Sequence, residues 1–309
     1  MSKPISTNIT HDAFLKSILS DRGAALAFMH TFLPVEVSTL LDIDAYNPGS
    51  ISFITSKMKT RLADVVFEVP LKNSQENAFV TILIELKSSP DKYAVFQILE
   101  YIAQAYRKQL KDKKKLQLII PVIYYHGKPR WKYNDINAFF QHSPKALTKF
   151  IPTFSSLFID LKDKNETELQ EIKNDLLRVA LNVQYLQFLK SIDVSILERT
   201  FTGIHEGMDW NHFKIILVYA LRKSEINRDI FDDFIEDFPQ DTKNKTMTIA
   251  EQLIQEGKKK GIEQGIEQGI QQKTIEFVVK SFESGISIPV ITKISGLSQS
   301  EVRAILNKK

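Results

Sequence analysis

The stretch "ILIELKSSPDKYAVFQILEY" (residues 82–101) decides the fold, because it joins a strand, a turn and the start of a helix. Residues 78–87 are rich in apolar and β-branched side chains, which is typical of a buried strand. The following "SSPD" predicts a strand end and a helix start, with Asp91 as the N-cap. Apolar residues recur at helical spacing over 92–114, which predicts a long amphipathic helix.

Further strand-like runs lie on both sides of this unit. Residues 50–56 and 61–69 are typical strands, and the polar segment "PLKNSQEN" predicts a hairpin that pairs 61–69 with the strand at 78–87. Residues 116–127 form another apolar strand after the helix. Since residues 8–46 have a helical pattern, the order is helix, antiparallel strands, helix, strand. The sequence therefore predicts an α/β domain.

We divide the chain into four segments: an α/β core over 1–160, a helical extension packed on it over 161–256, a repeat over 257–286 and a tail over 287–309. The repeat is built on Gly-Ile-Glu-Gln tetrads. Each helical Gly costs about 1 kcal/mol relative to Ala, so the repeat is either a helix paired with a second copy or a flexible linker. The tail resembles a helix-turn-helix, which can serve DNA binding, dimerisation or packing.

Composition limits the class of protein. The 309 residues include 43% hydrophobic residues and 20 Phe, enough for a core, and no Cys, which excludes disulfides and thiolate metal sites. The N-terminal sequence has no apolar signal region, and the longest apolar runs are too short to cross a bilayer. We expect a cytoplasmic protein with no membrane partner.

Positive charge is concentrated in one segment. Residues 107–115 contain six cations and one anion, although the net charge of the chain is only +4. Such clusters favour polyanions, so we expect salt-dependent contacts with the DNA backbone there. The predicted contacts are Lys108, Lys111, Lys113, Lys114 and Lys115. The alternative is a solvated helix end whose lysines complement the helix dipole.

The strand face predicts a hydrolytic site. Alternate side chains of a strand share a face, so Glu85 and Lys87 lie together, and Asp64 lies beside Glu85 if the two strands pair. Paired carboxylates suit Mg²⁺, with Mn²⁺ as a substitute, and a lysine alongside can activate water or stabilise charge on a phosphate. This is the equipment for phosphodiester hydrolysis. The alternative is an ordinary set of charges on an exposed strand.

The next helix adds polar groups on one face. Gln97 and Tyr101 are four residues apart, so their side chains are neighbours, and the Gln amide could orient Lys87 or a water molecule. The alternative is a common polar helix surface. We expect the helix to bury a different, apolar face, formed by Phe96, Leu99, Ala103 and Tyr106.

Four stretches together resemble a known family: "HDAFLK" (11–16), "LADVVFEV" (62–69), "ILIELKSSPDKYAVFQILEY" and "IIPVIYYHGKPRW" (119–131). The chain is similar, over residues 8–256, to the Rpn recombination-promoting nucleases, the YhgA-like putative transposase group of the PD-(D/E)XK superfamily. The resemblance implies a restriction-endonuclease-like core, a central mixed sheet flanked by helices, with a helical C-terminal half. It also implies a Mg²⁺-dependent DNA endonuclease linked to recombination or to defence against foreign DNA.

The resemblance implies a set of metal ligands. By position, Asp64 and Glu85 would bind the metal together with the backbone carbonyl of Leu86. Asp12 on the first helix would complete the site, with His11 as its neighbour. One departure is Ala63, which stands where the superfamily usually has proline.

The resemblance also implies catalytic roles. Lys87 would be the catalytic lysine, and Gln97 and Tyr101 match the Gln-x-x-x-Tyr element of the RecB-like branch. Many sequences of the family carry Gln where Lys87 stands. Lys is the general pattern of the superfamily at this position, and this chain has it. We expect His126 to be structural.

Alternatives to the nuclease remain open. The first is a non-catalytic DNA-binding or assembly protein on a nuclease scaffold, and the second is a strand-joining transposase, for which the three-acid pattern is absent. We expect a homodimer formed through the repeat. The resemblance further implies that a short product started at Met247 would bind and inhibit the full-length nuclease.

Overall fold

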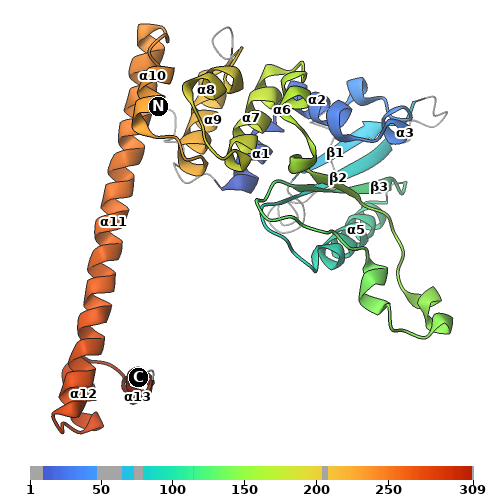
Figure 1. Cartoon of the computed structure of the whole chain (residues 1–309). Coiled ribbons are helices and arrows are strands. Elements are labelled where there is room, and N and C mark those ends of the chain that lie inside the picture. Colours follow the sequence, from blue (N-terminus) through green and yellow to red (C-terminus); the bar gives the residue numbers. More distant parts are fainter. Residues whose placement is uncertain (1–9, 47–64, 73–78, 114, 204–207, 308–309) are drawn as a thin grey trace. The chain divides into compact units, whose positions relative to one another are not determined.

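The computed structural model describes residues 10–46, 65–72, 79–113, 115–203 and 208–307 (Figure 1). The chain forms two compact units, Met1–Thr246 and Met247–Lys309. No described helix is both long and apolar enough to cross a membrane.

The first unit is built on a mixed four-stranded sheet. Its strands, in spatial order, are β1 (Val65–Pro70), β2 (Phe79–Lys87), β3 (Leu118–Tyr125) and β4 (Leu157–Asp160). β1 pairs antiparallel to β2, whereas the β2–β3 and β3–β4 pairs are parallel. The predicted pairing of the two strands of the hairpin and the α/β class are confirmed. The predicted strand at 50–56 lies outside the described residues.

Helix α5 (Ala94–Lys111) connects β2 to β3 and covers one face of the sheet. Its side chains in this core pack against Val66, Leu83 and Ile123, which come from three different strands. The helix contributes Ala94, Ile98, Tyr101 and Ala105. The predicted apolar face is therefore wrong, since Ala103 is exposed and the others of that set are only half-buried. The cause is Tyr101, whose ring is buried and completes a stripe with helical spacing.

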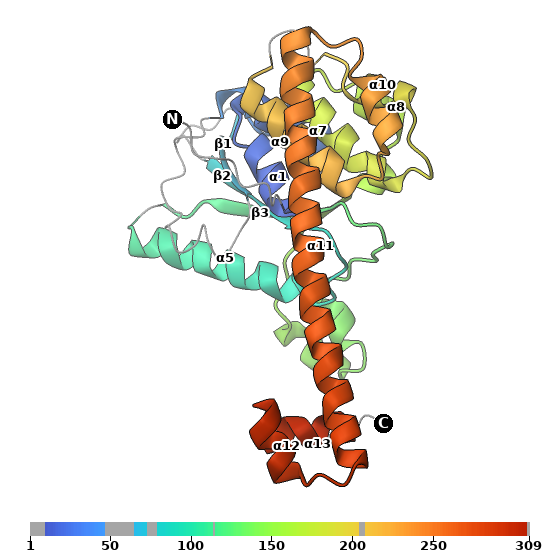
Figure 2. The ribbon, with the colours of Figure 1, turned by 90° about the vertical axis from the view of Figure 1, so that its left-hand side faces the viewer.

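Helices of the N-terminal and C-terminal parts of the unit cover the opposite face (Figures 1 and 2). They include α1 (His11–Ile18), α2 (Arg22–Phe32), α7 (Asp175–Tyr185) and α9 (Trp210–Lys223). The side chains of Ile82, Ile84 and Leu86 are buried on β2, and they alternate with Glu85 and Lys87, which face α5. The sheet is thus enclosed by helices on both sides, as expected for a largely parallel arrangement.

Smaller elements complete the first unit: α3 (Val35–Ser38), η1 (Ile43–Ala45), η3 (Ile136–Phe140), η4 (Lys145–Phe150), η5 (Leu161–Asp163), α6 (Glu166–Gln170), η6 (Leu186–Phe188), α8 (Val194–Thr200) and α10 (Arg228–Phe234). Asp and Asn residues cap many of these helices, as Asn165 does in a capping box with Glu168 at the start of α6.

The second unit contains most of α11 (Gln240–Glu283), a 44-residue helix, followed by α12 (Ile288–Ser295) and α13 (Gln299–Leu306). Of the two alternatives for the repeat, the structure has the helix. The expected two-helix tail is also present, with Gly296 in a left-handed conformation between the helices. A small core of Val278, Ile291 and Val302 joins the three helices.

Candidate active site

Strand β2 directs Glu85 and Lys87 toward α5, as the alternation predicts. The Glu85 side chain is only 7% exposed, and its Oε1 accepts a hydrogen bond from Gln97 Nε2 at 2.8 Å. The Lys87 ammonium lies 3.3 Å from the same oxygen. A carboxylate this buried needs such partners, because burial of an isolated charge is costly.

Lys87 is held by three side chains. Its Nζ donates to Gln97 Oε1 at 2.7 Å and to Asp91 Oδ2 at 3.2 Å, in addition to its ion pair with Glu85. The Lys87 side chain is 16% exposed. Two carboxylates and an amide oxygen therefore surround one ammonium, which fixes the position of its nitrogen at the end of the strand.

The role predicted for Asp91 is wrong in detail. Helix α5 begins at Ala94 with Tyr93 at the N-cap position and no side-chain cap bond. Asp91 Oδ1 accepts the Tyr93 N–H at 2.9 Å, while its other oxygen binds Lys87. The spacing of four residues between Lys87 and Asp91 is the one local sequence feature that goes with this contact.

Gln97 connects the strand to the helix. Its amide oxygen accepts from Lys87, and its amide nitrogen donates to Glu85 and to the Tyr101 hydroxyl. Because Gln97 and Tyr101 are one helical turn apart, both reach the same polar cluster. Five side chains thus form one connected set of hydrogen bonds and ion pairs: Glu85, Lys87, Asp91, Gln97 and Tyr101. We call this set the β2–α5 network.

The β2–α5 network supplies carboxylate and amide oxygens, the type of ligand that Mg²⁺ and Mn²⁺ bind. The Lys87 ammonium contacts oxygens of Glu85, Asp91 and Gln97. The described residues contain no group of three or more acidic or histidine side chains placed to hold a metal. Asp64, the second expected ligand, lies outside the described residues, just before Val65, which pairs with Ile84.

The other expected ligands are the backbone carbonyl of Leu86, which lies between Glu85 and Lys87 on β2, and Asp12. The side chain of Leu86 is buried on the face away from α5, and the residue pairs with Tyr124 of β3. Asp12 lies in the first turn of α1, which covers the face opposite to α5. There its charge contributes to raising the pKa of the Tyr219 hydroxyl, after the larger effect of burial. The participation of Asp12 and the Leu86 carbonyl in a metal site stays a prediction.

A buried histidine supports the end of β2. The backbone N–H of His126 donates to the Lys87 carbonyl at 3.0 Å, and the His126 side chain is fully buried. Its ring lies 5.1 Å from the ring of His11, whose Nδ1 is 2.6 Å from the Tyr219 hydroxyl. Burial lowers the pKa of His126 to about 3, with a smaller effect of His11, and burial followed by Lys223 lowers the pKa of His11 to about 4.

His126 makes the protein sensitive to acid. The unfolded chain binds a proton at His126 below about pH 6.5, whereas the folded protein does so only near pH 3, so stability falls as the pH decreases between these values. At pH 5 the loss from this residue is about 2 kcal/mol relative to pH 7.5. We expect His126→Leu to remove that part of the pH dependence of urea unfolding, followed by tryptophan fluorescence.

The exposed His142 provides the control for this experiment. His142→Leu is expected to leave the pH dependence as in the parent protein. An equal pH dependence in the parent and His126→Leu proteins would contradict the prediction.

The basic run lies away from this network. Gln97 and Lys111 are fourteen residues apart on α5, which corresponds to about 21 Å along the helix axis. Lys108 forms an ion pair with Asp112, and Lys111, Lys113 and Lys115 are exposed, while Lys114 lies outside the described residues. DNA binding by these lysines stays a prediction, and the structure does not bring them to Glu85.

A different cationic segment adjoins the network. The loop after β3, residues 126–132, passes so close to the end of β2 that a Cβ on Gly127 would lie 2.4 Å from the Ser88 carbonyl oxygen. This loop carries the exposed Lys128, Arg130 and Lys132. The sequence alone does not indicate this position, because only the pairing of β3 with β2 places the loop beside Lys87.

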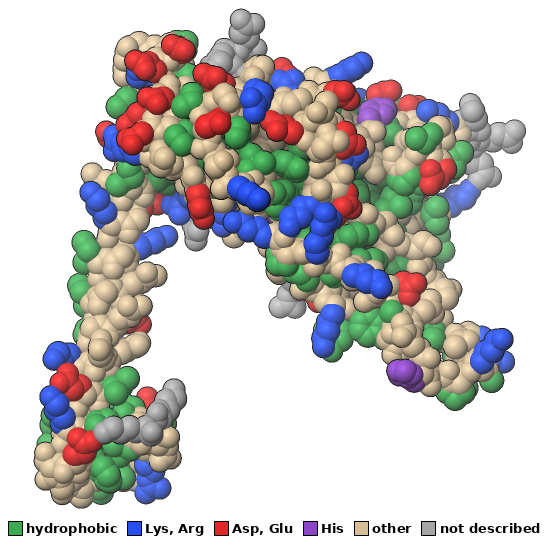
Figure 3. Space-filling model, in the orientation of Figure 1, with side chains coloured by type: hydrophobic (Ala, Val, Ile, Leu, Met, Phe, Trp, Pro, Cys, Tyr) green, Lys and Arg blue, Asp and Glu red, His purple; other side chains and the backbone are tan. Residues whose placement is uncertain are grey.

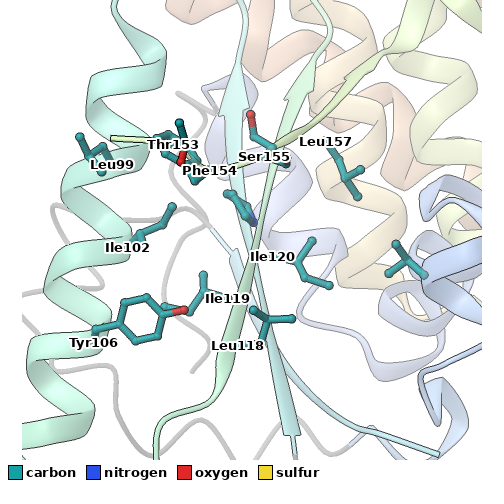
Figure 4. A pocket seen from close by; sticks show the side chains of 13 residues that line it. Leu99, Ile102, Tyr106, Leu118, Ile119, Ile120, Thr153, Phe154, Ser155 and Leu157 are labelled. Carbon is teal, nitrogen blue, oxygen red and sulfur yellow. The ribbon is translucent and has the colours of Figure 1, made fainter. Parts of the chain in front are cut away.

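An apolar groove of about 530 Å³ lies between α5 and the sheet (Figure 4). Leu99, Ile102 and Tyr106 line it from the helix, and residues 118–121 and 153–157 line it from the sheet side. None of the β2–α5 network residues lines this groove, so it is separate from the candidate active site.

A family model and several curated proteins match this chain, and their descriptions agree with one another. The family model described as "Putative transposase, YhgA-like" matches residues 9–211. Among curated proteins, the recombination-promoting nuclease RpnC of Escherichia coli K12 is 32% identical over 128 residues, which is 41% of each chain. RpnD of Escherichia coli O157:H7 is 29% identical over 40% of this chain and 47% of its own length.

A third relative matches over a longer region. The inactive recombination-promoting nuclease-like protein RpnE of Escherichia coli K12 is 23% identical over 226 residues, 72% of this chain and 74% of that protein. The matches thus span less than half of RpnC and RpnD but about three quarters of RpnE. No solved structure matches the chain significantly.

Proposed function

The chain belongs to the YhgA-like putative transposase family, and from this premise we propose that it is a nuclease that cleaves DNA in recombination. Two of the relatives reported above are named recombination-promoting nucleases, which supports the proposal. The observation that carries it is the placement of Lys87 among Glu85, Asp91 and Gln97. We further propose that the enzyme acts in the cytoplasm and that foreign DNA is among its substrates.

We propose Mg²⁺ or Mn²⁺ as the cofactor, held by Asp64, Glu85 and the Leu86 carbonyl, with Asp12 as a further ligand. When bound, such an ion would supply Lewis-acid chemistry that activates water and offsets the charge of the phosphate. Lys87 has the chemistry to stabilise the negative charge that grows on a phosphodiester. Gln97 holds the Lys87 nitrogen and the Glu85 carboxylate in fixed positions, and Tyr101 holds the Gln97 amide.

Nicking of supercoiled plasmid DNA tests this function. Purified protein with Mg²⁺ should convert supercoiled to open-circular DNA, and EDTA should stop the reaction. If both the full chain and residues 1–246 bind DNA but never cut it, the nuclease proposal is refuted.

A scaffold without catalysis is the second candidate, favoured by the match to RpnE, which is named inactive and covers more of this chain. In that case the β2–α5 network would be a structural polar cluster. A titration with Mn²⁺ discriminates the two, because only the nuclease should bind the metal with an affinity that drops in Asp64→Ala.

We propose that α11 pairs with a second copy of itself. Ile262, Ile266 and Ile270 are between 59% and 64% exposed, and they recur every four residues beside glycines. Figure 3 shows hydrophobic side chains on the surface of the long helix. A Cβ on Gly261 or Gly265 would meet nothing within 4 Å, so a partner helix has room to approach closely. Burial of this apolar stripe would offset the low helix propensity of the glycines.

Ile266→Lys should therefore convert the dimer to a monomer, because each copy would place a charge in the helix pair. Light scattering coupled to size-exclusion chromatography measures the mass. Glu267→Lys, one residue away on the helix, is the control and should remain dimeric. A monomeric parent protein would refute the pairing.

A product that starts at Met247 would contain the whole second unit with its core of Val278, Ile291 and Val302. We propose that it pairs with full-length chains through α11 and restrains cleavage. Addition of purified 247–309 to the nicking reaction should lower the rate, and an unchanged rate would refute inhibition.

A further inference from the structure

Exposed aromatic rings lie beside the candidate active site. Tyr93, at the start of α5, is 54% exposed, and Phe139, from η3, is 37% exposed. Their ring centroids are 5.9 Å apart with an interplanar angle of 27°. Phe96 packs against Phe139 at 4.9 Å and so supports the pair from α5. We call Tyr93 and Phe139 the aromatic platform.

The platform is tied to Lys87 by two hydrogen bonds. Asp91 accepts the backbone N–H of Tyr93 with one carboxylate oxygen and the Lys87 ammonium with the other. The position of the Tyr93 backbone is therefore linked to the nitrogen that is proposed to contact the phosphate.

Cations accompany the platform. The Lys92 ammonium lies 4.7 Å from the centroid of the Tyr93 ring. Lys92 is exposed, so its flexible side chain can leave the ring and meet a phosphate when another group stacks there. The exposed Lys128 and Lys132 follow β3 in the loop that touches Ser88. Aromatic faces with cations around them are the composition of surfaces that bind single-stranded nucleic acid.

We propose that the aromatic platform stacks one unpaired base of a DNA strand whose phosphates are bound by Lys92 and the 126–132 loop. The inference rests on the proposed nuclease function and specifies its substrate. The enzyme acts on DNA whose bases are unpaired next to the scissile phosphate, as in gaps, frayed ends and melted segments. In an intact duplex each base is stacked on its neighbours, so the platform has nothing to bind.

Binding of oligonucleotides in EDTA tests the platform without cleavage. The probe is a short single strand that contains 2-aminopurine, whose fluorescence is quenched by stacking, and the comparison is its perfect duplex. We expect the parent protein to quench the single strand and to bind it more tightly than the duplex. Tyr93→Ala should raise the Kd for the single strand about tenfold, the size expected for loss of one stacked base, and abolish the quenching.

Two variants control for indirect effects. Tyr93→Phe keeps the ring and should retain both affinity and quenching. Phe150→Ala removes another exposed aromatic ring, which also has a lysine near its face, Lys149 at 5.2 Å. Phe150 lies in η4 and is not part of the platform, so this variant should bind like the parent protein.

Each result decides between the two proposals. Quenching that depends on Tyr93 but no cleavage of any DNA would support the platform and refute the nuclease. Metal-dependent cleavage without preference for unpaired DNA, or single-strand binding that is unchanged in Tyr93→Ala, would overturn the platform and leave the nuclease.

Discussion

Lys87→Ala is expected to slow metal-dependent plasmid nicking by about 10²- to 10³-fold, the usual cost of removing one group that stabilises charge in a transition state. The substitution removes the ammonium that contacts Glu85, Asp91 and Gln97. Two carboxylates would then lie together without their counter-charge, and the approach of a phosphate would be opposed by both. Initial rates of open-circular product at saturating Mg²⁺ measure the effect.

The matched control is Lys164→Ala. Lys164 also forms an ion pair with an acid four residues away, Glu168 at 3.4 Å, and its side chain is 29% exposed. It lies outside the β2–α5 network, so its loss should leave the rate within about twofold, as expected for a surface pair of small energy. A Lys87→Ala protein that is folded by circular dichroism and cuts at the parent rate would contradict the assignment of Lys87.

Gly127→Ala is expected to lower the free energy of unfolding of the first unit by about 3 kcal/mol, the upper part of the range for overpacking. The new Cβ would lie 2.4 Å from the Ser88 carbonyl oxygen and 2.4 Å from the Tyr125 hydroxyl. Because Ser88 O is a backbone atom, the contact is relieved only by moving the loop away from β2. Urea unfolding followed by tryptophan fluorescence reports this unit, since both tryptophans, Trp131 and Trp210, belong to it.

Gly261→Ala is expected to have the opposite effect on stability, because the added Cβ meets no other atom of the chain. No atom lies within 4 Å of its added Cβ, and Ala in a helix interior is favoured over Gly by about 1 kcal/mol. In a single chain the variant should therefore stabilise α11, measured by far-ultraviolet circular dichroism at a protein concentration where the helix is unpaired, and leave the fluorescence transition unchanged. A Gly127→Ala protein with the parent's urea midpoint would show that the loop does not press on the strand end.

The parts of the site that the sequence predicts correctly are those set by local geometry. Glu85 and Lys87 share a face because side chains alternate along a strand, and Gln97 and Tyr101 meet because they are one turn apart. Contact between the two pairs needed one further step, the crossover of α5 onto the face of β2 that carries Glu85. The structure confirms that step through the hydrogen bonds of Gln97.

The parts that the sequence missed depend on tertiary contacts. The buried face of α5 could not be chosen from periodicity alone, because Tyr101 has both an apolar ring and a hydroxyl and was counted as polar. The cap role of Asp91 was assigned from its place before a helix, whereas its carboxylate is divided between Tyr93 and Lys87. The loop at 126–132 is 39 to 45 residues from Lys87 in sequence and reaches it only through the β2–β3 pairing.

The rigid length of α5 sets a footprint on the substrate. The distance of about 21 Å between the turn with Gln97 and the turn with Lys111 equals about six nucleotide steps of 3.4 Å, the spacing along one strand of the paired DNA that continues beyond the cleavage point. A strand that lies along α5 with its scissile phosphate at Lys87 would present to the basic run a phosphate about six nucleotides away. The helix would then act as a ruler, measuring how far uninterrupted backbone must extend from the point of cleavage.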